Sequence, residues 1–390
     1  MSRLRTVRDL EVRGRRVLLR VDFNVPLADG TVVDDTRIRA ALPTIRFLRD
    51  RGASVVLCSH LGRPKGKLVA GLSLRPVGAR LAMLLGAEVE FSEDCVGPKA
   101  RAAVRGLRPG GLLMLENTRF HPEETENNQD FAKQLADLAE LYVNDAFGSA
   151  HRAHASTEGV AHFLPSAAGL LVEQEVNFLR EALNAPERPY VVVLGGAKIS
   201  DKLGLVRKLM DEADAMLIGG GMANTFLASQ GLDLADSLVE RDSLATAAEL
   251  LARAGTRLHL PTDVVAAAAL SELAEHRVTR VDQIPAGWRA VDIGPQTLQQ
   301  FTDVLLPAKT ILWNGPMGVF EVSPFAAGTR EIAQAIAGRQ ALTIVGGGDS
   351  VAAVQQAGLA AQFTHLSTGG GATLALLEGQ PLPGLAVLQA

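Results

Sequence analysis

Short apolar runs alternate with helical segments along the chain, and the runs end in polar or glycine-rich turns. In the first half, strands that run into loops are expected over residues 15–27, 53–62, 110–120 and 140–154. Segments with helical spacing are expected over residues 34–50, 75–85 and 128–139. Because the apolar runs are short and do not clearly alternate with polar residues, they fit buried parallel strands. The order of these elements predicts an α/β fold.

The second half repeats a different local pattern, in which an apolar strand, a glycine-rich turn and a helical segment follow one another. The stretches with this pattern are YVVVLGGAKISDKL (190–203), MLIGGGMANTFL (216–227), VDIGPQTLQQF (291–301), LTIVGGGDSVAAV (342–354) and HLSTGGGATLALL (365–377). Glycines after a strand let the backbone approach a phosphate, and the helix that follows offers unpaired N–H groups and the positive end of its dipole. This half is therefore expected to bind a nucleotide.

The first half carries arginines, histidines and short polar side chains, most of them where its expected strands end. They are Asp22, Asn24, Arg37, His60, Arg63, Arg119, His151 and Arg152. Arginine binds carboxylate and phosphate through two parallel hydrogen bonds. Since ligands of open α/β sheets lie beyond the carboxyl ends of the strands, we expect these side chains to converge on one cleft. A small-anion site in one half and a nucleotide site in the other indicate a kinase.

The length of 390 residues exceeds the size at which one hydrophobic core usually keeps growing, so two domains are expected. Prolines at 186 and 189, just before a strand, mark a boundary. We predict an N-terminal anion-binding domain over 1–170, a connecting helix over 171–185, a nucleotide domain over 186–370 and a C-terminal segment over 371–390 that returns to the first domain.

Composition excludes several classes of protein. The net charge of −4 provides no basic excess for a general nucleic-acid binder. The two cysteines, Cys58 and Cys95, have no metal-type spacing, and Cys58 is expected to be a reduced core residue. The first residues lack the apolar region of a signal peptide, and no apolar run approaches membrane-spanning length. We therefore expect a cytoplasmic protein with no membrane or nucleic-acid partner.

Generic nucleotide motifs fit poorly. HLGRPKGKL approaches a P-loop, but Leu61 stands at the first glycine position and Leu68 replaces the serine or threonine. Neither glycine turn that approaches a dinucleotide fingerprint completes it, because Asn224 and Val351 stand at the third glycine position. A dehydrogenase of similar architecture and a catalytically silent nucleotide-binding scaffold remain alternatives at this point.

A set of strings along the chain resembles the phosphoglycerate kinase family. In chain order they are RVDFNVPL, HLGRPKGK, LLENTRFHPEE, VNDAFGSAHRAHAST, GGAKISDK, LWNGPMGVFE, GGGDS and STGGGATL. The resemblance extends from Val17 to Leu388. One departure is Asn224, where many relatives have an aromatic residue.

The resemblance implies two doubly wound, Rossmann-like parallel-sheet domains joined by a helix and a hinge. It implies reversible, Mg²⁺-dependent, in-line phosphoryl transfer between ATP and the carboxylate of 3-phosphoglycerate, giving ADP and 1,3-bisphosphoglycerate, in a monomer whose domains close through 171–185 and 368–371. The acceptor carboxylate is already ionised at neutral pH, so the reaction needs no general base. Positioning and charge neutralisation remain for the protein to supply.

By resemblance the substrate-binding residues lie in the first half. They are Asp22, Phe23, Asn24, Arg37, His60, Leu61, Gly62, Arg63, Arg119 and Arg152. The two polar residues Asp22 and Asn24 would hold the hydroxyl, and Arg37 would lie near the reacting carboxyl. The anion basket for the 3-phosphate would comprise His60, Arg63, Arg119 and Arg152. The alternatives are solvated surface charges for the arginines and a phosphohistidine nucleophile at His60.

The nucleotide-binding residues implied by the resemblance lie in the second half. They are Gly196, Lys198, Lys202, Gly294, Asn314, Glu321, Gly347, Gly348, Asp349 and Ser350. The spacing of Lys198 and Lys202 predicts one shared helix face. Asp349 is the expected Mg²⁺ ligand, with a helix N-cap as its other role, and Glu321 would accept a ribose hydroxyl. The residues expected in catalysis are Arg37, Lys198, Gly348 and Gly371.

Overall fold

The computed structural model describes residues 3–389, which pack into two compact units. One unit holds the chain up to Asn177 and from Gln380 onward, and the other is Phe178–Gly379. The division falls within helix α5 (Leu170–Asn184), in the predicted connecting segment. Residues 371–379 group with the second unit, so the segment that belongs to the first unit begins at 380. The predicted functional domain boundaries and the closure of the domains remain predictions.

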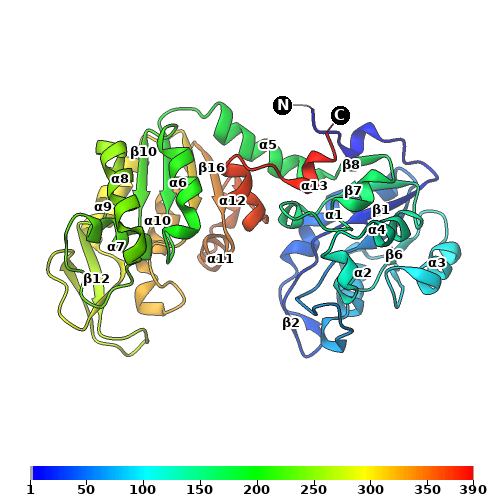
Figure 1. The fold of residues 1–390 in the computed structure, drawn as a ribbon, viewed down its shortest axis with the longest axis horizontal. Helices are drawn as coiled ribbons and strands as arrows, with labels where there is room; N and C mark the ends of the chain where they lie inside the picture. The colour runs from blue at the N-terminus through cyan, green and yellow to red at the C-terminus, as the bar shows by residue number, and fades with distance from the viewer. Residues whose placement is uncertain (1–2, 390) are drawn as a thin grey trace. The chain divides into compact units, whose positions relative to one another are not determined.

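The described part of the first unit is built on a six-stranded parallel sheet in the order β5-β6-β4-β1-β7-β8 (Figure 1). Its strands are β1 (Arg16–Arg20), β4 (Ser54–Cys58), β5 (Glu90–Phe91), β6 (Leu112–Met114), β7 (Leu141–Asn144) and β8 (Ser166–Ala168). A small hairpin joins β2 (Leu27–Ala28) to β3 (Thr31–Val32). Strands β1, β4, β6 and β7 are buried almost throughout, which explains their apolar sequences.

The helices of the first unit are α1 (Thr36–Asp50), α2 (Arg75–Leu85), α3 (Gly97–Gly106), α4 (Gln129–Ala136) and α13 (Pro383–Ala386). Its 3₁₀ turns are Val7–Asp9, Ala70–Leu72, Thr118–Phe120, Pro122–Glu124, Phe147–Ser149 and Gly159–His162. The apolar faces of α1 and α2 pack on one side of the sheet and form its main core. The helix predicted over 34–50 begins two residues later, because the Asp34 carboxylate accepts the backbone N–H of Thr36 at 2.9 Å.

The described second unit has a parallel sheet of the same size, in the order β11-β10-β9-β15-β16-β17. Its strands are β9 (Tyr190–Leu194), β10 (Ala215–Ile218), β11 (Leu258–His259), β15 (Thr310–Asn314), β16 (Leu342–Gly346) and β17 (His365–Leu366). The order reverses between β9 and β15, which is where doubly wound folds bind ligands. The two parallel sheets confirm the predicted fold class.

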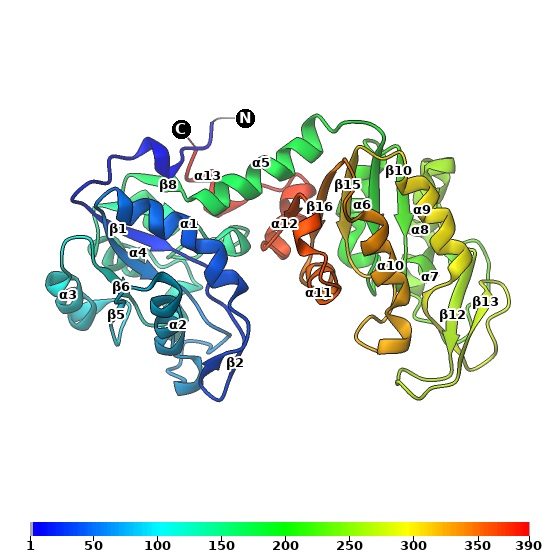
Figure 2. The ribbon, with the colours of Figure 1, turned by 180° about the vertical axis from the view of Figure 1, so that it is seen from behind.

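Helices surround this second sheet (Figure 2). They are α6 (Leu203–Met210), α7 (Gly220–Ser229), α8 (Leu244–Ala254), α9 (Pro295–Leu305), α10 (Ala327–Ile336), α11 (Gly348–Gln356) and α12 (Gly371–Leu377). The 3₁₀ turns are Ser200–Lys202, Arg241–Ser243, Gly255–Arg257, Ser323–Phe325 and Ala360–Gln362. No helix within residues 3–389 is both long and apolar enough to cross a membrane.

The sequence pattern did not predict a separate antiparallel sheet in the second unit. It is formed by β12 (Asp263–Ala267), β13 (His276–Arg280) and β14 (Arg289–Ile293), with β12 in the middle. The strand–turn–helix pattern of 291–301 is therefore right locally, as β14 followed by α9. Its strand belongs to this small sheet rather than to the parallel one, because a local pattern does not specify the strand's partner.

Asp145, directly after β7, holds the beginning of helix α5. Its Oδ1 accepts the backbone N–H of Leu171 at 2.9 Å and of Val172 at 3.4 Å, while its buried Oδ2 has no hydrogen-bond partner in the described part of the chain. Burial raises the pKa of Asp145 to about 7, against the lowering effect of Thr44 and of these N–H groups. The native state therefore keeps this proton at pH values where the unfolded chain has lost it.

We predict that Asp145→Asn removes part of the pH dependence of stability. Because the native pKa lies above the unfolded value of about 3.9, the free energy of unfolding of the wild type should fall as pH rises from about 4 to about 7. The amide keeps the Oδ1 acceptor and carries no charge, so the free energy of unfolding of the variant should equal that of the wild type near pH 4. It should be more stable by ~1 kcal/mol or more at pH 8. Urea unfolding at both pH values measures this, and a constant difference would contradict it.

Candidate active site

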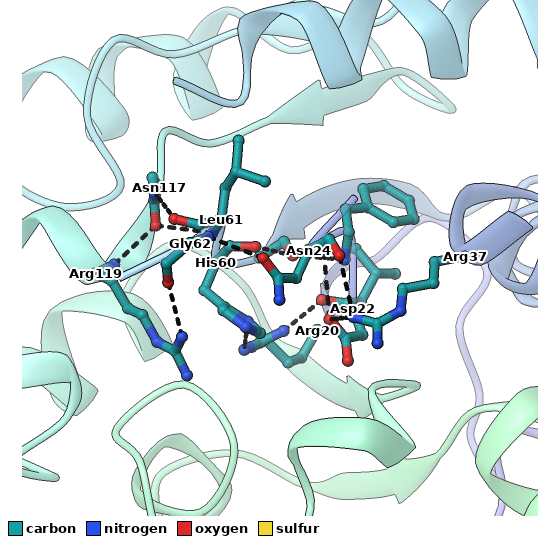
Figure 3. A network of polar contacts seen from close by, with 12 residues as sticks. Arg20, Asp22, Asn24, Arg37, His60, Leu61, Gly62, Asn117 and Arg119 are labelled. Atoms are coloured by element: carbon teal, nitrogen blue, oxygen red, sulfur yellow. Dashed lines mark hydrogen bonds and ion pairs between the residues drawn. The ribbon is translucent and has the colours of Figure 1, made fainter. Parts of the chain in front are cut away.

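In the first unit, polar side chains after β1 contact a side chain from the first turn of α1. Nη1 of Arg37 donates to the backbone oxygen of Asn24 at 3.1 Å and lies 3.4 Å from Oδ1 of Asp22 (Figure 3). The Asp22 side chain is 13% exposed and that of Arg37 is 38% exposed. The structure thus brings these three predicted residues together, with the guanidinium of Arg37 still accessible.

The loop after β4 lies between two asparagines. Oδ1 of Asn24 accepts the backbone N–H of Gly62 at 2.8 Å, and Asn117 both accepts from and donates to the backbone of Leu61, at 3.2 and 2.7 Å. Nη1 of Arg119 donates to the Gly62 oxygen at 2.9 Å (Figure 3). These bonds fix the backbone of the loop relative to the ends of β1 and β6.

Three predicted arginines reach one cavity of about 380 Å³ in this unit. Arg63, Arg119 and Arg152 line it together with Lys65 and His154. Burial, with the charges of Arg20 and Arg152, lowers the pKa of Arg119 to about 10, which leaves it charged at neutral pH. Burial beside Arg119 lowers the pKa of His154 to about 4. The cavity is therefore strongly cationic and suits a phosphate.

Some predicted substrate residues take part through their backbone or lie in the interior. The side chains of Phe23 and Leu61 belong to the hydrophobic core, so only their main-chain atoms are available to a ligand. The His60 side chain is 5% exposed and does not line the cavity. His151 accepts a hydrogen bond from Nε of Arg152 at 3.1 Å.

Three residues at or near this cavity were not predicted from the sequence: Arg20, Lys65 and His154. Arg20 interrupts the apolar run of β1 and is fully buried, so a lone arginine inside a core strand was the signal available. Lys65 stands in the HLGRPKGK string beside Arg63 and lines the same cavity. His154 carried no distinguishing signal, because its burial depends on the folding of the loop after β7.

In the second unit, a cavity of about 480 Å³ lies beside the glycine turns. Of the predicted nucleotide residues, Gly196, Glu321 and Asp349 line it. The other walls include Val291, Asp292 and Ile293 of β14, together with Met317 and Val319 of the loop after β15. The sequence predicted the strand β14, but it did not indicate that this strand forms an apolar wall of the cavity.

The two predicted lysines differ in their surroundings and do not share a helix face. Lys198 is exposed in the turn after β9, whereas Lys202 precedes α6 at the end of a 3₁₀ turn. Nζ of Lys202 donates to the oxygens of Gly195 and Asn314, at 2.6 and 3.0 Å, and so links the ends of β9 and β15. Burial lowers its pKa to about 8. The prediction of a shared face was wrong because the helix begins only at Leu203.

Close backbone packing explains several glycines of the second unit. Gly315 has a φ of +97°, and a Cβ there would overlap the Gly195 oxygen and Nζ of Lys202. A Cβ on Gly294 would overlap the carboxylate of Asp263, which caps α9 by accepting the N–H of Thr297 at 2.7 Å. By contrast, a Cβ on Gly348 would meet no atom of the described residues within 4 Å.

The remaining predicted residues lie at the start of helices or at strand ends. Gly348 and Gly371 are the first residues of α11 and α12. Oγ of Ser350 accepts the N–H of Gly315 at 2.6 Å, and Nδ2 of Asn314, which is buried near Gly347, has no hydrogen-bond partner among residues 3–389. Asn314 therefore retains a donor for a ligand or a water.

Asp349 fits an Mg²⁺ ligand. Its carboxylate is exposed, lines the cavity and lies close enough to Lys202 to favour the charged ammonium. No hydrogen bond to its side chain is found among the described residues, so the oxygens are available to a hard cation that keeps several waters. The alternative role as a helix N-cap finds no support in the hydrogen bonding of α11, whose N-cap residue is Gly347.

Comparisons with known proteins agree with this arrangement. Residues 7–380 match the family described as phosphoglycerate kinase. The phosphoglycerate kinase of Roseiflexus castenholzii is 59% identical over 389 residues, 98% of each chain, and that of Moorella thermoacetica is 55% identical over 386 residues, also 98% of each. The structure of phosphoglycerate kinase from Coxiella burnetii superposes with a TM-score of 0.89 at 40% identity, covering 99% of both chains. The chain belongs to the phosphoglycerate kinase family and is a phosphotransferase acting between ATP and the carboxylate of 3-phosphoglycerate.

Proposed function

We propose that the first unit binds 3-phosphoglycerate through the cationic cavity and the polar residues after β1. The observation that carries this proposal is that Arg63, Arg119 and Arg152 line one cavity. These arginines would bind the 3-phosphate, and the role of the buried His60 as a further donor stays a prediction. Asp22 and Asn24 would hold the hydroxyl, and the accessible guanidinium of Arg37 would face the reacting carboxyl.

The second unit is proposed to bind ATP or ADP at its glycine turns. Gly196, Gly347, Gly348 and the start of α11 would approach the phosphates, with the ribose at Glu321 and the base against the apolar wall of β14. Lys202 has three donors, of which two bind strand-end oxygens, so the third can reach a phosphate without breaking the turn. Lys198, which is exposed, would contact the transferred group, and Gly371 would offer its N–H there.

The chemistry required from these residues is positioning and neutralisation of charge. The substrate carboxylate attacks without a base, because it is already ionised. Mg²⁺ held by Asp349 would neutralise charge on the nucleotide phosphates. The arginines and Lys198 would stabilise the negative charge of the transition state, as preorganised charges do. The monomeric state and the cytoplasmic location remain predictions.

A coupled assay tests this function directly. ATP consumption should require both 3-phosphoglycerate and Mg²⁺, and an ATP-to-ADP conversion without 3-phosphoglycerate should be negligible. Absence of turnover in a protein that binds ATP would favour the alternative of a catalytically silent relative.

For Arg37→Ala we expect kcat to fall by roughly 10²-fold or more, with little change in ATP binding, because an oriented charge matters most in the transition state. The matched control is Arg39→Ala, which removes an exposed arginine of the same helix that pairs with Asp35. If both variants keep the wild-type kcat at saturating substrates, Arg37 is not a catalytic residue.

Replacement of Asp349 by Asn should weaken the use of MgATP while leaving the binding of 3-phosphoglycerate unchanged. The amide preserves shape but loses the charge that attracts the cation. Activity measured against Mg²⁺ concentration should shift to higher concentrations, whereas Asp303→Asn, on the exposed side of α9, should not shift it. An unchanged Mg²⁺ dependence of Asp349→Asn would remove this residue as a metal ligand.

Two glycine variants of the second unit distinguish an effect on ATP binding from an effect on stability. Gly348→Ala meets no protein atom, so its thermal stability should stay near that of the wild type, while KM for ATP should rise because the methyl group stands where a phosphate would approach. Gly294→Ala should lose ~1–3 kcal/mol of stability, because its methyl group overlaps the cap of α9. Equal effects of both variants on stability would refute this distinction.

A further inference from the structure

Arg20 is a fully buried arginine, and each of its three guanidinium nitrogens contacts a specific acceptor. Its Nε donates to Oγ of Ser156 at 2.8 Å, Nη1 donates to the backbone oxygen of Val21, and Nη2 lies 3.0 Å from Nδ1 of His60. Figure 3 shows the guanidinium of Arg20 beside the His60 ring. A guanidinium is always charged and cannot accept a hydrogen bond.

The contact with Arg20 therefore determines where the His60 proton lies. Because Nη2 can only donate, Nδ1 of His60 must accept, and a ring that accepts at Nδ1 carries its proton on Nε2. We infer that Glu124, Ser156 and Arg20 form a positioning relay that holds His60 as the neutral Nε2–H tautomer. None of the three needs to touch the substrate for this role.

Ser156 and Glu124 fix the orientation of Arg20. The Ser156 hydroxyl accepts from Arg20, so its own proton is free to donate to Oε1 of Glu124, at 2.6 Å. The Ser156 backbone N–H donates to the other carboxylate oxygen at 3.0 Å. Glu124 is fully buried, and its negative charge compensates the buried guanidinium. Arg20 therefore donates in two directions, to Nδ1 of His60 and to the Ser156 hydroxyl, and the hydroxyl donates onward to Glu124.

The surroundings of His60 also disfavour a second proton on the ring. Burial lowers the pKa of His60 well below its usual range, and the neighbouring positive charges lower it further. The cations and the titratable group that act on it are Arg20, Arg119, Arg37 and His154. A protonated ring would also place an N–H at Nδ1 against the Nη2 donor of Arg20. Geometry and electrostatics thus give the same protonation state.

This inference rests on the proposed function only in its consequence for the substrate. If His60 binds the 3-phosphate, it does so as a neutral donor through Nε2–H, and its contribution to binding stays constant through the pH range in which free histidine titrates. The relay would then be what allows a histidine to act as a fixed donor among arginines.

The direct test is the state of the ring in the unliganded protein. ¹⁵N chemical shifts of the imidazole nitrogens in histidine-labelled protein distinguish the two tautomers and the protonated ring, and the His60→Gln variant assigns the signals. We expect His60 to have an unprotonated Nδ1 and a protonated Nε2 from about pH 5 to 8, the range in which free histidine titrates. A proton on Nδ1, or a ring that titrates near its usual pKa, would overturn the inference.

Variants of the relay test the positioning role. Ser156→Ala removes the acceptor of Nε, and Arg20→Met removes the donor to His60, so both should populate the other tautomer. With Arg20→Met the pKa of His60 should also rise toward its usual value. Ser149→Ala, at another buried serine of the same loop region, is the control and should leave the His60 shifts unchanged. Shifts of His60 that stay at wild-type values in Ser156→Ala would refute the relay, even if Arg20→Met does not fold.

Kinetics separate the relay from the substrate role of His60. If both hold, Ser156→Ala should raise KM for 3-phosphoglycerate by about tenfold with a smaller change in kcat, and KM should become pH-dependent in Arg20→Met. A changed tautomer with an unchanged KM would keep the relay and remove His60 from the substrate site. A changed KM with an unchanged tautomer would refute the relay and leave the substrate site as proposed.

Discussion

A buried carboxylate allows the cations of the first unit to lie close together. Arg20 and Glu124 are both fully buried, and each would be costly to bury alone. The Ser156 hydroxyl connects them, so the positive charge in the interior is compensated within the protein. Arg63 and Arg152 are exposed and have no such partner among the described ion pairs. The interior charge is thus neutralised in advance, while the charge at the cavity surface remains for an anion.

In the second unit, close packing of the backbone, rather than a group of arginines, positions a cation. Gly195 and Gly315 pack against each other without side chains, and this brings the ends of β9 and β15 close enough for one ammonium group to bind both. Lys202 is therefore part of the turn's structure as well as a candidate phosphate ligand. Its location at the point where the strand order reverses follows from the topology, since parallel strands present their last carbonyl oxygens at the same edge.

The sequence predicted the parts of the fold that depend on local pattern. Buried parallel strands have continuous apolar runs, so β1, β4, β9 and β16 begin within a few residues of the predicted apolar runs, whereas β15 was not predicted as a strand. The antiparallel sheet was missed because β14 has the same local pattern as a parallel strand, and neither β12 nor β13 was predicted as its partner. The face shared by Lys198 and Lys202 was wrong for a related reason: a spacing of four residues has meaning only inside a helix. The family match sets aside the dehydrogenase alternative.

Burial decides which members of a sequence motif can contact a ligand through their side chains. The strings around Asp22 and His60 predicted that neighbouring residues all bind the substrate. In the structure, some of these residues are buried in the core and others lie in the loops. Phe23 and Leu61 fill the core, and the bonds that hold their backbone are made by Ser59 and Asn117. Arg20 is visible in the sequence as an arginine inside an apolar strand, but the sequence does not show what the guanidinium contacts. Its role depends on Ser156, 136 positions away, and such a partner is visible only once the chain is folded.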